Sequence, residues 1–415
     1  MTEKRKSPAL RFRGYTDDWE QRKLSEIATM HARIGWQNLR TSEFLDSGAY
    51  MLITGTDFID GAVNFDTCHY VERERYEQDK HIQIRNGSIL ITKDGTLGKV
   101  AYIQGLTMPA TLNAGVFNVE IKDENEIDNR YLFQYLKAPF LMDYVDKKAT
   151  GGTIKHLNQN ILVDFPVVLP HKAEQEKIGE FFLAIDHLIT LHQRKLEKLK
   201  LVKKSMLEKM FPKNGSSVPE IRFNGFTDDW EQRKVSELAE KTYGGGTPTT
   251  SNEAYWNGDI PWIQSSDVMD GKLLGVEPRK WITQAGLNNS AAQLIPENSI
   301  AIITRVGVGK LAFMPYSYAT SQDFLSLSKL NAEPFFTVYA CYKELQTGLN
   351  AVQGTSIKGI TKDELLAKNI VVPRYAEQQQ IGAFFKNLDH LITLHQRKVE
   401  KLQIMKKSML EKMFV

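Results

Sequence analysis

Few side chains in this 415-residue sequence are spaced in a way that supports catalysis. The chain has neither the His-Glu-x-x-His pattern of zinc hydrolases nor the Gly-x-Ser-x-Gly pattern of serine hydrolases, and its nine histidines are scattered. Asp128, Asp146 and Lys148 could form a nuclease site, but the stretch RYLFQYLKAPFLMDYVDKK around them has helical periodicity, and the second half lacks an equivalent Asp-x-Lys. The residue types therefore favour a protein that performs no chemistry itself.

Two glycine-containing stretches, TKDGTLGKVAYI (92–103) and TRVGVGKLAFM (304–314), invite comparison with a phosphate-binding loop. The Walker pattern requires glycine five residues before its Gly-Lys pair, where this chain has Lys93 and Thr304. Valine and leucine also follow the two lysines where the pattern requires Ser or Thr. Both stretches instead predict a strand, a tight turn and a second strand.

Basic and polar residues gather at these turns and at two other loops, as contacts to DNA would require. GGGTPTT (244–250) is a backbone-permissive loop that could approach DNA closely, and ATSQDF (319–324) offers a glutamine suited to reading adenine. Solvated hairpins and a structural turn are the alternative interpretations. The candidate DNA-binding residues are Lys93, Thr96, Lys99, Gly246, Thr247, Arg305, Lys310 and Gln322.

Length and composition limit the class of protein. A chain of 415 residues exceeds the usual size of one core, so at least two domains are expected. No apolar run is long enough for a membrane span, and the first residues lack the apolar core of a secretory signal, so we expect a cytoplasmic protein. Cys68 and Cys341 lie far apart without a Cys-x-x-Cys partner, which excludes a disulfide framework and a zinc knuckle.

The elements that must position the candidate residues occur twice. RFRGYTDDWEQRKLSEIA (11–28) returns as RFNGFTDDWEQRKVSELA (222–239), and LPHKAEQEKIGEFF (169–182) aligns with VPRYAEQQQIGAFF (372–385). Similarity is weak across the middles, roughly residues 29–150 and 240–352. The chain is therefore a tandem duplication whose halves share a frame and carry different inserts.

Each half ends in a predicted helix. DHLITLHQRKLEKLKLVKKSMLEKMF (186–211) and DHLITLHQRKVEKLQIMKKSMLEKMF (389–414) differ at four of 26 positions, and their apolar residues recur at helical steps. One such helix cannot bury its own apolar stripe, but two copies can pair as an antiparallel coiled coil. The residues expected in helix pairing or partner docking are Ile185, Leu188, Leu199, Val202, Met206, Leu388, Leu391, Leu402, Met405 and Met409.

The helices also suggest a functional geometry. Twenty-six residues make a rod of roughly 40 Å, close to the separation of about 34–36 Å between two DNA half-sites one turn apart. Residues 186–211 hold seven Lys/Arg against three Asp/Glu, and 389–414 hold six against three, an excess that could face phosphates or an acidic partner, or could solvate the helices. The histidines at 187, 192, 390 and 395 are expected on helix surfaces or partner-facing positions rather than as metal ligands.

The order of variable domain, repeated helix, variable domain and repeated helix resembles the specificity subunit of type I restriction-modification systems. The resemblance covers nearly the whole chain. In the first half GWQNLRTSEF (35–44) replaces the Gly-Thr-Pro loop of the second. The stretches that carry the resemblance are DDWEQRKLSEIA, DDWEQRKVSELA, GGGTPTT, IPWIQSSDVMDGKL (260–273), ITRVGVGKLAF (303–313), GTSIKGI (354–360), VVPRYAEQQQIGAFF and the repeated helices.

This resemblance implies a fold and a set of partners. Members have two α/β target-recognition domains separated by long helices that pair as an antiparallel coiled coil, an α+β arrangement with a pseudo-two-fold axis. Each domain reads one half of a bipartite site in double-stranded DNA, and the helices set the gap and dock two methyltransferase subunits. S-adenosylmethionine is bound by the methyltransferase subunits, which usually methylate adenine, and ATP and Mg²⁺ by the restriction (motor-nuclease) subunits.

The resemblance and the repeats together give domain boundaries. We expect recognition domains at 1–170 and 221–373, helices at 171–212 and 374–415, and a linker at 213–220. Three alternative functions remain at this stage. One is an enzyme, a nuclease or a self-contained methyltransferase, which the missing catalytic motifs oppose. The second is a specificity subunit that serves a fused methyltransferase-nuclease, and the third is a non-catalytic coiled-coil adaptor.

Overall fold

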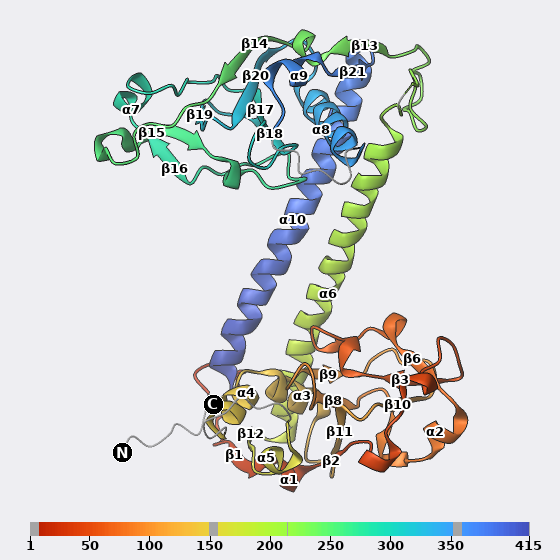
Figure 1. The fold of residues 1–415 in the computed structure, drawn as a ribbon. Coiled ribbons are helices and arrows are strands. Elements are labelled where there is room, and N and C mark those ends of the chain that lie inside the picture. The colour runs from red at the N-terminus through yellow and green to blue at the C-terminus, as the bar shows by residue number, and fades with distance from the viewer. Residues whose placement is uncertain (1–7, 149–156, 214, 352–358, 415) are drawn as a thin grey trace. The chain divides into compact units, whose positions relative to one another are not determined.

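Residues 8–148, 157–213, 215–351 and 359–414 are described by the computed structural model (Figure 1). The chain divides into two units. The N-terminal unit comprises residues 1–191 together with 399–415, and the C-terminal unit comprises residues 192–398. Most of the GTSIKGI stretch lies outside the described residues.

Two sheets and a helix form layers in the N-terminal unit. The first sheet has the order β2-β11-β8-β9 and is antiparallel, and the second has the order β6-β3-β10-β7 with β3 and β10 parallel. Helix α3 (Asn129–Lys137) packs against the first sheet. The strands are β1 (Glu20–Lys23), β2 (Ala28–His31), β3 (Tyr50–Ile53), β4 (Phe58–Ile59), β5 (Ala62–Val63), β6 (His69–Val71), β7 (Gln83–Ile84), β8 (Ile89–Thr92), β9 (Val100–Tyr102), β10 (Ala110–Leu112), β11 (Val116–Ile121) and β12 (Pro166–Leu169).

Strand β8 explains why the layers form. All four of its residues are buried, because both faces of the strand are covered. Ile89 and Ile91 belong to the core that includes α3, whereas Leu90 belongs to the core shared with the second sheet. A continuous apolar run is therefore required here, not the alternation of a half-exposed strand.

The C-terminal unit repeats this arrangement. Its sheets have the orders β14-β20-β17-β18 and β16-β15-β19, and α8 (Pro334–Ala351) packs against the first. Strand β17 again divides its side chains between two cores, with Ile302 on the α8 side and Ile303 on the other. The strands are β13 (Glu231–Lys234), β14 (Ala239–Gly244), β15 (Trp256–Ile263), β16 (Lys280–Ile282), β17 (Ser299–Ile303), β18 (Leu311–Met314), β19 (Ala319–Thr320), β20 (Phe324–Leu330) and β21 (Asn369–Val372).

The predicted hairpins are confirmed, and the divergent middles share one topology. β8 pairs with β9 and β17 with β18, each antiparallel around a glycine-containing turn. In both units a short outer pair, β1 with β12 and β13 with β21, joins the first repeated stretch to the strand before the long helix. The remaining α-helices are α1 (Leu24–Ile27), α2 (Arg73–Glu77), α4 (Phe140–Lys148), α5 (Gln159–Val163), α7 (Gln284–Asn288) and α9 (Lys362–Ala367).

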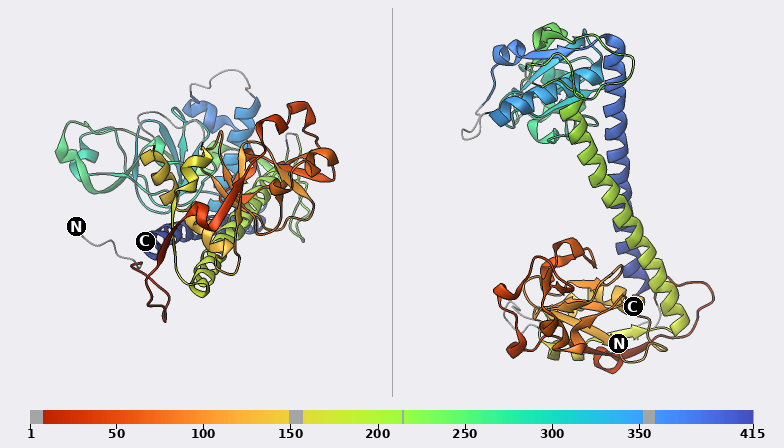
Figure 2. Two further views of the ribbon diagram at one scale, coloured as in Figure 1. Left: turned by 90° about the horizontal axis from the view of Figure 1, so that it is seen from below. Right: turned by 90° about the vertical axis from the view of Figure 1, so that its right-hand side faces the viewer.

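Helices α6 (Lys172–Lys209) and α10 (Tyr375–Met413) each contribute residues to both units (Figures 1 and 2). In the N-terminal unit, the beginning of α6 packs with the end of α10, and in the C-terminal unit the end of α6 packs with the beginning of α10. The two helices are therefore antiparallel, as the repeat predicted. With 38 and 39 residues they extend roughly 57 Å, longer than the rod of about 40 Å expected from the near-identical segments alone.

Matching ion pairs fasten the helices within each unit. Lys406 donates to the Asp186 carboxylate at 2.6 and 2.7 Å, and in the other unit Lys203 lies 2.6 Å from Asp389. These are the same two positions of the repeat with their helices exchanged. Burial, with nearby Lys137, lowers the pKa of Lys406 to about 8 despite the favourable carboxylate.

The last aromatic residue of each repeat completes a core. The Phe414 ring lies 5.4–5.7 Å from those of Tyr131, Tyr135 and Phe182, all in the N-terminal unit. The Phe211 ring lies 5.7–6.2 Å from those of Trp230, Phe336 and Phe385, all in the C-terminal unit. The core of each unit thus includes the beginning of one long helix and the last aromatic residue of the other repeat.

The helix histidines differ from the expectation in one respect. His187 and His390 are exposed, but His395 is buried and its Nδ1 lies 2.9 Å from Nδ1 of His192. The two occupy the same position of the repeat, so the contact follows from the antiparallel pairing. No helix among the described residues is long and apolar enough to cross a bilayer.

Candidate nucleic-acid interface

The candidate residues of the C-terminal unit lie on loops that leave the two sheets. Arg305 is exposed in the β17–β18 turn, and Lys310 is half-buried at the end of that turn. Gln322 is exposed in the loop between β19 and β20. The Thr304 amide donates to the Asp323 carbonyl at 2.8 Å, which holds these two loops together.

The Gly-Gly-Gly-Thr-Pro loop joins the same group. The side chains of Thr247 and Gln322, 75 positions apart in the chain, are hydrogen-bonded at 2.6 Å and both residues are exposed. Gly246 is buried instead, and a Cβ at this position would lie 2.3 Å from the carbonyl carbon of Ala291, so the position requires glycine. Its carbonyl accepts from Trp262 Nε1 at 2.9 Å. Gly246 therefore shapes the loop, and Thr247 is the loop residue with an accessible polar side chain.

The N-terminal unit carries a comparable loop at the β8–β9 turn. Thr96 and Lys99 are exposed there, and the Lys93 ammonium lies 5.4 Å from the centre of the Phe117 ring. Lys99 N donates to Thr92 Oγ1 at 2.9 Å, which closes the turn. Lys99 and Thr96 are therefore the accessible polar side chains, while Lys93 is partly engaged with the sheet.

No function is predicted from the sequence for one further loop in each unit. The 3-10 turn Gly55–Asp57 follows β3, and Ser265–Asp267 follows β15. In both, a buried aspartate accepts from the backbone amide three residues earlier, at 2.8 Å from Thr54 and 3.0 Å from Gln264. The stretches ITGTDFIDG and IQSSDVMDG share the Asp and Asp-Gly positions, a signal present in the sequence.

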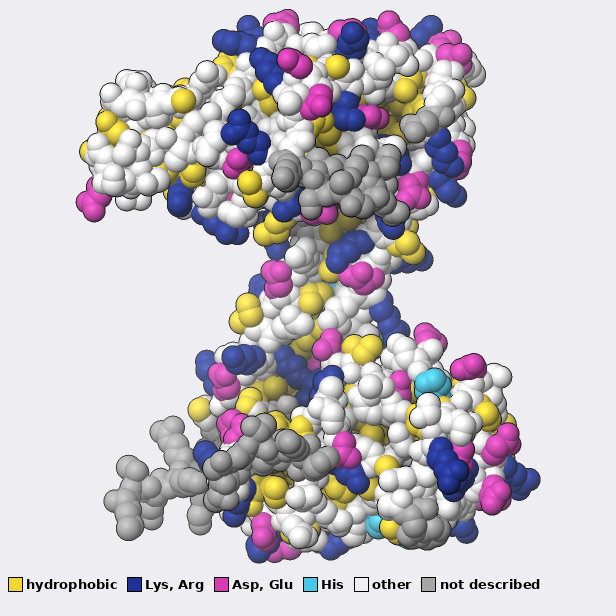
Figure 3. All heavy atoms as spheres, in the orientation of Figure 1, with side chains coloured by type: hydrophobic (Ala, Val, Ile, Leu, Met, Phe, Trp, Pro, Cys, Tyr) yellow, Lys and Arg dark blue, Asp and Glu magenta, His cyan; other side chains and the backbone are white. Residues whose placement is uncertain are grey.

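Charge alone does not define the interface. Lys and Arg side chains are interspersed with Asp and Glu on the face drawn in Figure 3. Several cations of the recognition domains are paired, including Arg75 with Glu43 and Lys368 with Glu344. DNA contacts must therefore be argued from loop position and accessibility, not from a continuous basic patch.

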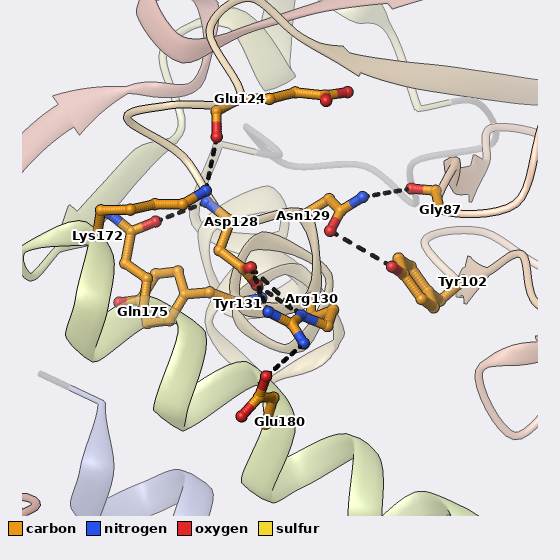
Figure 4. Close-up of polar contacts among 10 residues, drawn as sticks. All are labelled: Gly87, Tyr102, Glu124, Asp128, Asn129, Arg130, Tyr131, Lys172, Gln175 and Glu180. Carbon is orange, nitrogen blue, oxygen red and sulfur yellow. Dashed lines mark hydrogen bonds and ion pairs between the residues drawn. The ribbon is translucent and has the colours of Figure 1, made fainter.

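Helix α3 is fastened to α6 by a polar group in which Asp128 and Gln175 are buried (Figure 4). Asp128 caps α3 by accepting from the Tyr131 amide at 2.9 Å, and Arg130 bridges Asp128 and Glu180 of α6 at 2.9 and 2.8 Å. The hydrogen bond that Arg130 donates to the Asp128 carboxylate is the main reason that the pKa of Arg130 is raised. Gln175 accepts from the Asp128 amide at 2.9 Å. Asp128 is thus a capping residue.

Close approach of two helices strengthens this attachment. A Cβ at Gly179 of α6 would lie 2.8 Å from the Tyr131 nitrogen, and one at Gly382 of α10 would lie 2.9 Å from the Phe336 nitrogen. The same repeat position is therefore glycine in both helices because α3 and α8 begin against it. Asp146 and Lys148, the other members of the nuclease hypothesis, are exposed on α4, whereas Asp128 is buried.

Another repeated group ties the first segment of each half to its long helix. Arg11 donates twice to the buried Glu174, at 2.7 and 2.8 Å, and Arg222 does the same to Glu377. Bidentate pairs of this kind are directional and strong. The hydrogen bond to the glutamate is the main cause of the raised pKa of each arginine.

The helix residues expected in pairing or docking separate into two groups. Ile185 and Leu388 are buried in the cores of their units. Leu199, Val202 and Met206 pack against the C-terminal core, and Leu402, Met405 and Met409 pack against the N-terminal core. Leu188 and Leu391 are 42% and 40% exposed.

Further apolar side chains are exposed at matching positions of the two helices. Leu191 and Leu394 are 50% and 40% exposed, and Leu201 and Ile404 are 67% and 71% exposed. With Leu188 and Leu391 they form three equivalent pairs, each related by the helix repeat. The repeat thus exposes apolar side chains at equivalent positions of the two helices.

Comparison with known proteins agrees with this organisation. Residues 16–201 and 227–403 match the family described as type I restriction modification DNA specificity domain. The chain belongs to this family. It is therefore a specificity subunit of a type I restriction-modification system, the DNA-recognition component and not the catalytic one.

Relatives and a solved structure extend over the chain. It is 24% identical over 412 residues to the putative type I restriction enzyme MjaX specificity subunit of Methanocaldococcus jannaschii, covering 95% of this chain and 92% of the relative. The MjaVIII specificity subunit of the same organism is 24% identical over 349 residues, covering 80% and 79%. The fold matches the crystal structure of the type I restriction-modification S subunit from M. genitalium with a TM-score of 0.67, 14% identity and 99% of each chain covered.

Proposed function

We propose that each recognition domain of this specificity subunit reads one half of a bipartite site in double-stranded DNA. The supporting observation is that the two units share one scaffold but present different side chains on equivalent loops. The β8–β9 turn offers Thr96 and Lys99, whereas the β17–β18 turn offers Arg305 and Lys310. Different loops on the same scaffold are what two different half-sites require.

Within this proposal the candidate residues have separate tasks. Arg305, Lys310, Lys93 and Lys99 contact phosphates, which fixes the position of the domain on the duplex without reading sequence. The hydrogen-bonded pair Thr247 and Gln322 faces base edges, because an exposed amide can make two hydrogen bonds to adenine. Thr96 has the same task in the N-terminal domain, and Gly246 allows the backbone to turn beside Thr247.

The repeated helices are proposed to dock two methyltransferase subunits and to set the gap between the half-sites. Identical partners require identical surfaces, and the three pairs of exposed apolar residues on α6 and α10 satisfy this. In the complex, S-adenosylmethionine is bound by the methyltransferase subunits, and ATP and Mg²⁺ by the restriction subunits. The assembly acts on cytoplasmic DNA and directs adenine methylation or restriction.

The domain boundaries of this proposal follow the repeat. Recognition domains occupy 1–170 and 221–373, spacer helices 171–212 and 374–415, and the linker 213–220. A specificity subunit for a fused methyltransferase-nuclease would use the same chain, and gene context distinguishes the two systems. A coiled-coil adaptor without DNA reading is the remaining competitor.

A methylome tests the bipartite proposal. Adenine methylation is mapped at base resolution in the host with and without the gene, and loss of one split motif with a fixed gap is expected. The matched experiment exchanges residues 240–352 for the insert of another family member, which should change one half-site and leave the other. An exchange that alters both half-sites, or neither, contradicts the assignment of one domain to each half.

Binding measurements test the residue assignments on the methyltransferase-bound complex. Arg305→Ala should weaken binding to all duplexes and lower the salt slope by about one, as expected for one lost phosphate contact. Gln322→Ala should reduce the discrimination between the right and the wrong base at one base pair by about 1–3 kcal/mol, and leave the salt slope unchanged. Sequence-independent binding by the wild-type complex would support the adaptor instead.

A further inference from the structure

Three metal-ligating side chains converge in the N-terminal recognition domain, outside the loops assigned to DNA. They are His31 at the end of β2, His81 in the 3-10 turn η5 (Lys80–Ile82), and Glu120 near the end of β11. Their donor atoms all lie within 4.8 Å of one another. Among the described residues this is where three His, Cys, Asp or Glu donors meet closely enough for one ion.

Strand register brings two of the three donors together. In the β2–β11 ladder His31 lies opposite Asn118, and Thr29 lies opposite Glu120. His31 and Glu120 are therefore diagonal neighbours on one face of the sheet, within reach of each other. Glu120 Oε2 lies 3.3 Å from His31 Nε2.

The third donor is held over this face from the other sheet. The His81 amide donates to Asp79 Oδ1 at 2.9 Å, and Asn118 Nδ2 donates to the His81 carbonyl at 2.9 Å. His81 Nδ1 then lies 3.9 Å from Glu120 Oε2, and the imidazoles of His31 and His81 are stacked with centroids 4.5 Å apart. The backbone of the turn is thus positioned by hydrogen bonds while its imidazole stays open to solvent.

We propose that His31, His81 and Glu120 bind one divalent transition-metal ion of the zinc class. Two imidazoles and a carboxylate are a known zinc donor set, with bonds of about 2.0–2.2 Å and one coordination position left for water. Tetrahedral geometry at these bond lengths separates donors by about 3.4 Å, and a bound ion lies in the plane of each imidazole. Because the two rings are stacked with an interplanar angle of 18°, binding requires the exposed His81 ring to turn out of the stack. The His81 and Glu120 side chains are 66% and 51% exposed, so both are free to move.

Imidazole donors also select the ion. Mg²⁺ and Ca²⁺ prefer oxygen ligands, so a site with two nitrogens among three donors favours Zn²⁺ and its neighbours over them. The bound ion would join β2 and β11 of one sheet to the turn that leads into β7 of the other. Its consequence is therefore greater stability of the N-terminal recognition domain.

The C-terminal unit supplies an internal comparison. At the matching positions of its β14–β20 ladder, Tyr243 lies opposite Ser326 and Lys241 lies opposite Ser328. These residues include no imidazole and no carboxylate, so the same scaffold lacks the donor set there. The proposed ion is accordingly a property of one recognition domain.

Zinc binding to the full-length chain tests the proposal. The protein is prepared without a polyhistidine tag, treated with chelator, and titrated with ZnSO₄ in competition with a zinc-sensitive dye. His81→Ala and Glu120→Gln change exposed side chains, so both variants should fold, and each should weaken zinc binding at least tenfold. His69→Ala removes a histidine elsewhere in the same domain and should bind zinc as the wild type does.

Thermal unfolding gives a second, independent readout. At Zn²⁺ about 100-fold above its Kd, the melting transition of the N-terminal unit should rise by roughly 5 °C or more in the wild type and His69→Ala, and not in His81→Ala. MgCl₂ should produce no such rise. The His192→Ala/His395→Ala double variant, which removes the helix histidine pair, should retain the zinc response. Wild-type zinc affinity equal to that of His81→Ala, or a zinc response that disappears only with the helix pair, would overturn the assignment.

Discussion

Truncation of the last aromatic residue tests how the helices complete the recognition domains. Phe414 is 4% exposed and belongs to the core of the N-terminal unit, although it follows a helix that begins in the other unit. Phe414→Ala should therefore destabilise the N-terminal unit alone. Phe211→Ala, the same repeat position, should destabilise the C-terminal unit alone.

The expected magnitude follows from the packing. Removing a buried phenylalanine costs about 3–5 kcal/mol, as transfer free energy of the ring plus the cavity left behind. Phe414 has aromatic neighbours on several sides, which limits how far the site can collapse, so the upper part of this range applies. For a unit of about 200 residues this corresponds to a decrease in Tm of roughly 10 °C. Ile404→Ala, at a position 71% exposed on the same helix, should change stability by less than about 0.5 kcal/mol.

Hydrogen exchange followed by mass spectrometry assigns the loss to a unit. Phe414→Ala should reduce protection in α3 and spare α8, and Phe211→Ala should do the reverse. The Tm of each unit is read from the exchange of its own peptides, because a two-unit chain need not unfold in one transition. Loss of protection in α8 on truncation of Phe414, or equal loss in α3 and α8, would refute the conclusion that the end of α10 completes the core of the N-terminal unit.

Three further predictions concern the helices. Asp186→Asn leaves Lys406 buried without its counter-charge and should lower the free energy of unfolding by about 3 kcal/mol. The double variant Asp186→Leu/Lys406→Met should recover most of this loss. A double variant as unstable as Asp186→Asn in a urea titration would disprove this account. Burial chiefly, with nearby positive charge, lowers the pKa of His395. The unfolded chain therefore binds the proton first, and the stability of the folded chain should fall as pH drops through about 6.5. His395→Gln should lose less stability than the wild type between pH 7.5 and 5.5, and equal shifts of the urea midpoint in the two proteins would exclude His395 as the cause. Leu191→Asp and Leu394→Asp should each reduce the methyltransferase subunits bound from two to one by native mass spectrometry, and retention of two would remove these leucines from the docking face.

Most of the architecture could be predicted because duplication makes it visible in the sequence. Near-identical helices, the hairpins around the paired glycine turns and the antiparallel pairing all follow from local pattern. The similar topology of the divergent middles could not be predicted from the sequence. Side chains on a strand that is buried on both faces need only be apolar, so their identities do not show which core each one faces. Ile302 and Ile303 face different cores, yet nothing in their identities distinguishes them.

The candidate site was less accessible to sequence reasoning because its contacts are distant in the chain. Gln322 and Thr247 were each identified as isolated candidates, but only the fold shows their hydrogen bond. The burial of Gly246 and of His395 likewise depends on neighbours that no local pattern encodes. Asp128 is set aside as a catalytic residue from the sequence, but its role as the cap of α3 appears only in the structure.

The repeated helices give a physical reason to expect that a recognition domain could be exchanged without rebuilding the protein. Each domain meets the helices through a small set of repeat positions, represented by Gly179 of α6 and Gly382 of α10. These contacts lie at the start of α3 or α8 and along the helices, away from the loops that carry the candidate DNA residues. A new insert that keeps the contacts to the helices is therefore free to vary every loop. On the function proposed above, DNA reading and assembly use separate residues, which fits the near-identity of the helices beside the divergence of the middles.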